Sequence, residues 1–330
     1  MPDVTFLSHE DVENSAEVAE YVGAVKEAYR QRGEGGAAEP RTKLTREDPS
    51  GMLTSYLAIL PDSGVMGGYV YAAGFDSGTM FVTPLYDAEE GRLLALIDGA
   101  HMNPYKTGAA GAVGVDSLAR EDSSVLGFVG AGSQARGQLR AVAEVRDLAD
   151  VKVFSRTPES RESFADEFDD QLSADVRPVE SSAAAVEDSD VVVTATTSYE
   201  PVFDGDRLSP GTHVTAMGQY HPERRELDAT TIERAKYVPD LRERIHSDAG
   251  SFILAREEGA VDDDHVHAEL GDVVAGTAPG RTSSEEVTVF DSGGNAIETV
   301  AAANLLYEKA DPDAGTELPY ATSNDAFPGR

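Results

Sequence analysis

A strand, a glycine turn and a helix follow one another between Val125 and about Arg146, and this segment constrains the fold more than any other. Its centre is GAGSQA, residues 130–135. Gly130 permits a tight turn, Gly132 would let the backbone approach a pyrophosphate, and Ala135 allows close packing of helix on sheet. The helix N-terminus would then face the phosphates. The segment therefore predicts a dinucleotide-binding turn; the plainer alternative is a tight turn without a ligand.

The residues that follow repeat the alternation of strand and helix. Further strands are predicted at 151–155, 176–179, 190–196, 212–217, 236–239 and 287–290, with helices at 158–168, 181–187 and 228–234. Such spacing describes βαβ units. We therefore expect an α/β fold with a doubly wound parallel sheet.

The N-terminal part of the chain has a different pattern. Ser8 and Asp11 resemble a capping arrangement that opens a helical pattern ending at Arg32 and Gly33. Short strands are predicted at 52–60, 67–74, 79–86 and 92–97, paired in an antiparallel way, and a helical stretch begins at Lys106. A final helix is expected from Asn295 to about Lys309, with an irregular tail beyond Asp311. A length of 330 residues favours two domains.

The charge balance limits the partners. The chain has 60 acidic and 27 basic residues, a formal net charge of −33, and no cysteine. This charge disfavours binding to nucleic acid and to anionic membranes. The acidic residues are dispersed, which suggests adaptation to molar salt, where repulsion is screened. Because no signal peptide and no apolar run of about 20 residues is found, a cytoplasmic protein is the simplest expectation.

Two further segments could carry chemistry. The second parallel strand ends in Ser155-Arg156-Thr157, where an NAD site usually has a carboxylate. An arginine flanked by hydroxyls can hold a 2′-phosphate, so NADP(H) is preferred and NAD(H) stays possible; the alternative is a solvated arginine. Lys106, in PYKTGAAG, is either a ligand for a substrate carboxylate or an exposed lysine.

Histidines and acidic clusters give weaker signals. His265 and His267 follow the acidic run 262–264, but on a helix they would point to different faces, so we expect no metal site. His101 and His221 flank the predicted site as weaker candidates for a proton donor. Tyr71 should face the same side of its strand as Tyr69.

Taken together, the segments resemble the ornithine cyclodeaminase/mu-crystallin family. The resemblance covers nearly the whole chain and rests on EPRTKL (39–44), YDAEEGRLLALIDG (86–99), KTGAAGAVGVDSLAR (106–120), GFVGAGSQARGQLRA (127–141) and the stretch 269–303. It implies that a Rossmann domain, residues 121–294, is inserted into a smaller α/β domain, residues 1–120 and 295–330. The smaller domain would bind substrate and form a homodimer interface.

The resemblance also implies roles for individual residues. Arg41 and Lys106 would hold a substrate carboxylate, although the family usually has arginine at the position of Lys106. The family's catalytic lysine aligns with Tyr69, and two further family aspartates align with Tyr220 and Thr299. The predicted cofactor contacts are Gly130, Gly132, Ser133, Gln134, Ala135, Ser155, Arg156, Thr157, Thr196, Met217, Gly218 and Ser292.

The function that this pattern implies is an NAD(P)H-dependent reduction of the imine of a small amino acid, or of a 2-oxo acid with an amine. Hydride would pass to the imine carbon, and Tyr69 or Lys106 would supply the proton. Two alternatives stay open. One is ornithine cyclodeaminase, an NAD-dependent lyase that gives proline and ammonia, and the other is a non-catalytic dinucleotide-binding protein.

Overall fold

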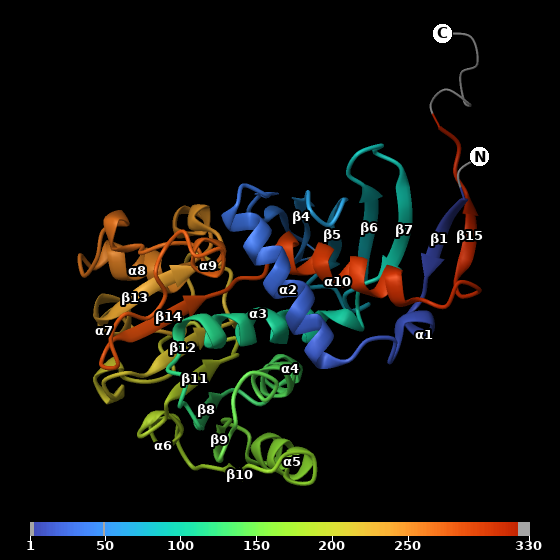
Figure 1. Ribbon diagram of the computed structural model, residues 1–330. Helices are drawn as coiled ribbons and strands as arrows, with labels where there is room; N and C mark the ends of the chain where they lie inside the picture. The colour runs from blue at the N-terminus through green and yellow to red at the C-terminus, as the bar shows by residue number, and fades with distance from the viewer. Residues whose placement is uncertain (1–2, 49, 323–330) are drawn as a thin grey trace.

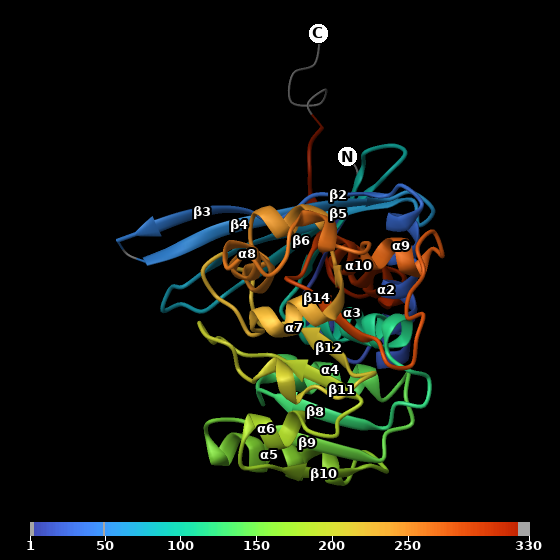
Figure 2. The same ribbon diagram turned by 90° about the vertical axis from the view of Figure 1, so that its left-hand side faces the viewer.

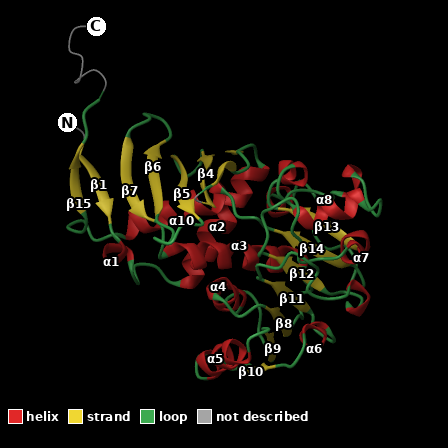
Figure 3. Ribbon diagram, turned by 180° about the vertical axis from the view of Figure 1, so that it is seen from behind, coloured by secondary structure: helices red, strands yellow, loops and turns green. Residues whose placement is uncertain are grey.

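Two β-sheets stand on either side of a central group of helices in the computed structural model, which describes residues 3–48 and 50–322 (Figure 1). One sheet is seven-stranded and the other eight-stranded. The helices α2 (Val18–Gly33), α3 (Met102–Leu118) and α10 (Ala296–Lys309) lie between them (Figure 3). Within the described part of the chain, no helix is long and apolar enough to cross a membrane.

The seven-stranded sheet is entirely parallel and has the order β10-β9-β8-β11-β12-β14-β13. The chain runs outward from β8 to β10 and then returns to β11 on the other side, so the strand order reverses between β8 and β11. In such sheets a ligand binds at the carboxyl ends of the strands, where the order reverses. The predicted α/β fold is confirmed. Its strands are β8 (Val125–Val129), β9 (Asp150–Phe154), β10 (Asp175–Pro178), β11 (Val191–Thr194), β12 (His213–Ala216), β13 (Ala235–Pro239) and β14 (Val287–Asp291).

Helices on both faces of this sheet complete the α/β part (Figure 2). They are α4 (Ser133–Val142), α5 (Pro158–Asp169), α6 (Ser182–Val186), α7 (Ala229–Arg234), α8 (Gly250–Glu257) and α9 (Leu270–Val274), with short 3₁₀ turns at Gly205–Arg207, Arg242–His246 and Asp263–His265.

The eight-stranded sheet is mostly antiparallel and has one covered face. Its strands are β1 (Asp3–Leu7), β2 (Ala37–Ala38), β3 (Thr42–Glu47), β4 (Ser50–Leu60), β5 (Val65–Ala73), β6 (Phe81–Asp87), β7 (Leu93–Asp98) and β15 (Thr316–Pro319), and α1 spans His9–Val12. The helix α10 contacts β4, β5 and β6, and Tyr56, Tyr69 and Tyr71 are buried on that side. The predicted antiparallel pairing of β4 to β7 is confirmed.

Close packing of α3 against α4 brings the two halves together at the site. A side chain at Gly108 would meet the carbonyl oxygen of Gly137 at 2.3 Å, and one at Gly137 would meet that of Pro104 at 2.3 Å. Only glycine allows this approach, which sets the first turns of α3 and α4 side by side. Lys106 and Gln134 consequently line one cavity.

Several elements differ from the sequence-based expectation. The tail is not wholly irregular, because β15 pairs antiparallel with β1, a contact between the two ends of the chain. The helical pattern from Ser8 is divided into α1 and α2 by a turn in which Asn14 has a φ of 59°. The capping box at Ser8 and Asp11 is confirmed. The strands β1, β2 and β3 and the helices α8 and α9 were not predicted, and the boundaries between the two domains stay a prediction.

Candidate active site

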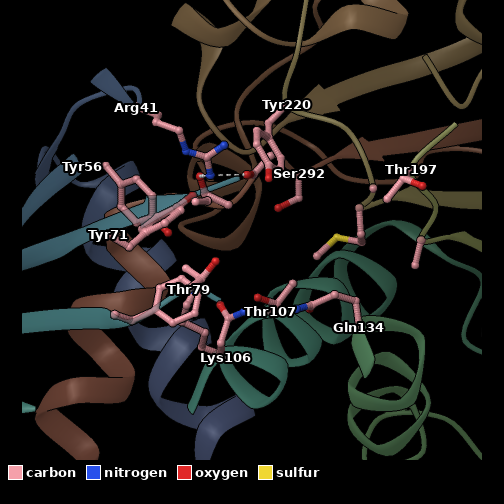
Figure 4. A pocket seen from close by; sticks show the side chains of 18 of the residues that line it. Arg41, Tyr56, Tyr71, Thr79, Lys106, Thr107, Gln134, Thr197, Tyr220 and Ser292 are labelled. Carbon is pink, nitrogen blue, oxygen red and sulfur yellow. Dashed lines mark hydrogen bonds between the residues drawn. The ribbon is translucent and has the colours of Figure 1, made fainter. Parts of the chain in front are cut away.

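A cavity of about 310 Å³ opens where the two halves meet (Figure 4). Strands β4, β5 and β6 supply aromatic side chains, and α3 and α4 supply polar ones. The ends of β11 and β12 and the loop between β14 and α10 complete the lining, which includes Arg41, Tyr56, Tyr71, Phe81, Asn103, Lys106, Thr107, Gln134, Thr196, Met217, Gly218, Tyr220 and Ser292. The cavity therefore joins the predicted substrate residues to the predicted cofactor residues.

Arg41 lines this cavity and has unused hydrogen-bond donors. Its Nη2 donates to the carbonyl oxygens of Gly293 at 2.7 Å and Gly294 at 3.2 Å. Its Nε and Nη1 are buried and have no hydrogen-bond partner among the described residues. Buried donors are nearly always satisfied in native proteins, so these two indicate a missing anionic ligand.

Two aromatic rings hold the guanidinium of Arg41 in place. Its centre lies 4.2 Å from the ring centroid of Tyr220 and 5.1 Å from that of Tyr56. The carbonyl oxygen of Tyr220 accepts a hydrogen bond from Lys43 Nζ, which fixes the loop. Tyr220, which the resemblance placed at the position of an aspartate, thus contributes a stacking surface instead of a carboxylate.

Lys106 is buried in the first turns of α3 and is part of an ion pair. Its Nζ donates to Glu298 Oε1 at 2.8 Å, and both side chains are almost completely inaccessible. The other carboxylate oxygen, Glu298 Oε2, has no hydrogen-bond partner in the described chain. Burial raises the pKa of Glu298, and the ammonium of Lys106 acts against that rise. The pair joins α3 to α10 at the wall of the cavity.

Tyr69 lies behind the lining. Its hydroxyl donates to the carbonyl oxygen of Gly99 at 2.7 Å, and its ring stacks on Phe81 with centroids 4.8 Å apart. Burial raises its pKa far above the ordinary value of 10. Tyr71 packs on the same side of β5, as expected, and does line the cavity. The hydroxyl of Tyr69 is therefore engaged and distant from the open space, whereas Lys106 borders it.

The glycine turn has the geometry of a phosphate cradle. Gly130 has a φ of 114°, and a Cβ there would meet the carbonyl oxygen of Ala195 at 2.4 Å. A Cβ on Gly132, the N-cap residue of α4, would meet nothing within 4 Å. No side chain caps the N-terminus of α4. The first amide groups of the helix can therefore donate to a pyrophosphate, and the turn fits a dinucleotide.

A second cavity of about 430 Å³ continues from this turn. Gly130, Ser155, Arg156 and Thr196 line it, and no carboxylate is among its described lining residues. Ser133 and Ala135 lie in the first turn of α4, and Thr157 is the N-cap residue of α5. Gln134 Oε1 is buried without a partner within the described residues, and its side chain borders the first cavity.

Glu226 was not predicted. It is bound to backbone groups of residues that line the two cavities. It accepts hydrogen bonds from Thr196 N at 2.6 Å, Gly218 N at 2.8 Å and Thr194 Oγ1 at 3.0 Å. Burial raises its pKa to about 7. One carboxylate thus fixes the ends of both β11 and β12. Its segment, PERREL, has no feature in the sequence that separates it from the other acidic surface residues.

A buried cluster supports the loop that holds Arg41. Arg244 pairs with Asp240 and Asp248 at 2.7 Å each and with Asp291 at 3.2 Å. Asp240 in turn accepts a hydrogen bond from the backbone N–H of Gly293 at 3.1 Å. The cluster therefore positions the carbonyl groups that orient Arg41.

The remaining candidates lie outside the cavities. His101 precedes α3 and contacts the ring of His9, and His221 accepts a hydrogen bond from the backbone N–H of Glu223. Thr299 Oγ1 donates to the carbonyl oxygen of Asn295 at 3.0 Å and is buried. The described residues contain no group of three or more His, Cys, Asp or Glu side chains that could hold a metal ion.

Known proteins resemble this chain in fold and in sequence. Residues 3–313 match the ornithine cyclodeaminase/mu-crystallin family. An alanine dehydrogenase of Archaeoglobus fulgidus is 35% identical over 314 residues, 93% of this chain and 95% of that protein. The Δ1-pyrroline-2-carboxylate reductase of Thermococcus litoralis, solved with NADH and L-proline, is 35% identical with a TM-score of 0.88, covering 93% of this chain and 97% of that one. An archaeal alanine dehydrogenase dimer with bound NAD has a TM-score of 0.89 and 33% identity, covering 97% of this chain and all of that chain.

Proposed function

Because the chain belongs to the ornithine cyclodeaminase/mu-crystallin family, we propose that it reduces the imine of a small amino acid with a nicotinamide cofactor. The imine is either cyclic or formed from a 2-oxo acid and an amine. The observation that carries the proposal is Arg41, a lining residue with two unused buried donors, in a cavity that shares Thr196 and its neighbours with the cavity at the glycine turn. Relatives named as a pyrroline-carboxylate reductase and an alanine dehydrogenase support it.

The residues of the cavity have separate roles in this reaction. Arg41 binds the substrate carboxylate through one of its unused donors, which places the C=N group against α3 and the ends of β11 and β12. The cofactor, when bound, supplies a hydride from C4 of its nicotinamide. Lys106 borders the same space and donates the proton to the substrate nitrogen, a role that Tyr69 cannot take while its hydroxyl is bound to Gly99. Tyr56, Tyr71 and Phe81 form an apolar wall that excludes water from the imine.

A net reductase fits the cavity better than a cyclodeaminase. A diamino acid such as ornithine carries a second ammonium group, which needs a carboxylate partner when buried. No Asp or Glu is among the described residues that line the cavity. Glu298 lies behind Lys106 and is already paired with it.

The cofactor preference proposed is for NADPH. Arg156 and Ser155 line the second cavity without a neighbouring carboxylate, and an arginine there would meet a 2′-phosphate. Arg156→Ala should raise the KM for NADPH at least tenfold and leave the KM for NADH within about twofold, since the lost charge-assisted contact is worth about 1.5–3 kcal/mol. Equal effects on both cofactors would remove Arg156 from the phosphate site.

We also propose a homodimer formed through the uncovered face of the eight-stranded sheet. The strand register puts Leu44, Leu53, Leu57, Ile59, Val70 and Val82 on that one face, and all six are exposed in the single chain. Monomeric proteins rarely leave so many neighbouring apolar side chains in water. The archaeal alanine dehydrogenase named above as a dimer supports the assignment.

The acidic composition supports a protein adapted to high salt, because a net charge of −33 repels itself unless it is screened. Its melting temperature should therefore rise from dilute buffer to molar KCl; a flat response would contradict the adaptation. The cytoplasmic location expected from the sequence stays a prediction.

The experiment that tests the function follows NADPH and NADH oxidation by absorbance in molar KCl. The substrates are five- and six-membered cyclic imino acids, and pyruvate or glyoxylate with ammonia or methylamine. Turnover of any of these imines, faster with NADPH, is the expected result. Release of ammonia and proline from ornithine with NAD and no net NADH would establish a cyclodeaminase instead. Cofactor binding without turnover on any of them would establish a binding protein.

A further inference from the structure

The buried ion pair with Glu298 changes the role that Lys106, the second cation beside Arg41, can have in the cavity. The sequence-based expectation was that Lys106 holds the substrate carboxylate together with Arg41. Here its Nζ lies 2.8 Å from Glu298 Oε1, and the carboxylate is completely buried. A substrate carboxylate approaching Lys106 would therefore meet a cation that already has its counter-ion, next to a second negative charge. Arg41 has no carboxylate partner of this kind among the described residues, and two of its donors are unused.

We propose that Glu298 is a positioning residue: it withdraws Lys106 from carboxylate binding, keeps it as the proton donor, and then serves as the counter-ion of the protonated imine. This inference rests on the proposed imine reduction and specifies how the site manages charge during that reaction.

The charges of the cavity balance at each step. With substrate bound, Arg41 neutralises the carboxylate and Glu298 neutralises Lys106. One proton then passes from Lys106 Nζ to the imine nitrogen, so the N–H bond of the lysine breaks and that of the iminium forms. The positive charge has moved to the substrate, and Glu298, released from the charge of Lys106, becomes a buried counter-ion for it beside the substrate's own carboxylate. Hydride addition to the carbon converts the iminium to the amine, and Lys106 regains a proton from water.

The unpaired oxygen of Glu298 supports this role. A buried carboxylate whose only task is to bind one lysine would gain from a donor on its second oxygen, because an unsatisfied buried acceptor costs about 1–3 kcal/mol. Glu298 Oε2 has no such donor among the residues described. It is therefore free to accept the electrostatic interaction, or the water-mediated contact, of a cation that forms transiently nearby.

Other ionisable groups surround the pair. Burial raises the pKa of Tyr71 to about 12 and also raises the pKa values of Tyr29, Tyr56 and Tyr69. Asp240 is paired with Arg244. Arg41 stays protonated. On β12, behind α3, burial lowers the pKa of His213 to about 3. The groups that face the pair are Tyr29 on α2, Tyr56 on β4, Tyr69 and Tyr71 on β5, Arg41, and Asp240.

The test compares wild type with Glu298→Gln and Glu298→Asp, and with Glu308→Gln as the matched control, an exposed glutamate on the same helix. In Glu298→Gln we expect kcat for the imine to fall about 10²-fold, with the KM for the imine changed less than about threefold. Glu298→Asp keeps the charge and should restore much of the rate, and Glu308→Gln should match wild type.

A second measurement does not depend on turnover. Cyanate carbamylates only unprotonated amines, and mass spectrometry of peptides reports Lys106 separately from the exposed Lys26. At one fixed pH, Lys106 should be carbamylated faster in Glu298→Gln than in wild type, because its amine has lost its carboxylate partner, while the rate at Lys26 should not change. An unchanged rate at Lys106 would overturn the proposal even if wild type reduces imines. A faster rate at Lys106 in a protein without imine turnover would refute the proposed function, although the ion pair itself would stand. If Glu298→Gln does not fold, a kcat about 10²-fold below that of wild type in folded Glu298→Asp would overturn the proposal.

Discussion

Replacement of Arg41 by alanine tests the carboxylate site most directly. Two nitrogens of its guanidinium are buried and unpaired, and the residue lines the cavity. A charge-assisted hydrogen bond from one of them to the carboxylate contributes about 1.5–3 kcal/mol, so its loss should cost that much transition-state binding. At about 1.4 kcal/mol per tenfold, kcat/KM should fall about 10- to 10²-fold. Most of the loss should appear in the KM for the imine, because the carboxylate is bound equally before and during the reaction.

The assay is NADPH oxidation with a cyclic imino acid, and its control is an imine without a carboxylate. With 2-methyl-1-pyrroline, wild type and Arg41→Ala should differ by less than about threefold, because the contact that the variant lacks has no partner there. Arg46→Ala, an exposed arginine on the adjacent β3, should behave as wild type on both substrates. An unchanged KM for the imino acid in Arg41→Ala, or an equal loss on both imines, would refute the assignment.

Three further predictions follow from the same structure. Arg244→Ala should lower the free energy of unfolding by about 3–5 kcal/mol in denaturant titrations, because it leaves buried carboxylates without their cation; an unchanged midpoint would contradict this. Glu226 has a pKa of about 7, above its ordinary 4.5, so its contribution to stability is full below pH 4.5 and is lost as pH rises through about 7. Between those pH values the free energy of unfolding of wild type should fall by about 3 kcal/mol relative to that of Glu226→Gln. Parallel plots of unfolding free energy against pH for the two proteins would contradict this prediction. Leu57→Glu should convert a dimer to a monomer in light scattering, whereas Tyr199→Glu, which is similarly exposed but lies in the loop after β11, should not.

Local signals in the sequence were sufficient for the parallel sheet and for the glycine turn at Gly130. The turn at Gly130 depends on φ and on close backbone contacts, and both follow from the absence of a side chain. The strands around it are short apolar runs bounded by turns. Edge strands were missed because their residues lack an apolar alternation; β15 forms only because β1 lies beside it.

Contacts between distant segments could not be predicted in this way. Lys106 and Glu298 are 192 residues apart, and Arg41 and Gly293 are 252 residues apart. Glu298 does carry a signal, since it is a lone charge within the apolar run AIETVAAA of the last helix. A charge that helical spacing places among core residues is buried and needs a partner, but the sequence does not identify which of 27 basic residues provides it.

The position of the positive charge decides how the substitutions at Tyr69 and Lys106 are interpreted. The family resemblance expects a lysine on β5 and an arginine on α3, and this chain has tyrosine and lysine there. The structure puts Lys106 Nζ 5.3 Å from the centroid of the Tyr69 ring, so the ammonium group occupies the space beside β5 although it comes from α3. A buried lysine–glutamate pair is seldom worth more to stability than well-packed apolar residues of the same volume. A protein that only binds a dinucleotide would therefore gain nothing by retaining this pair together with the unpaired donors of Arg41, whereas a reductase needs both a carboxylate site and a proton donor.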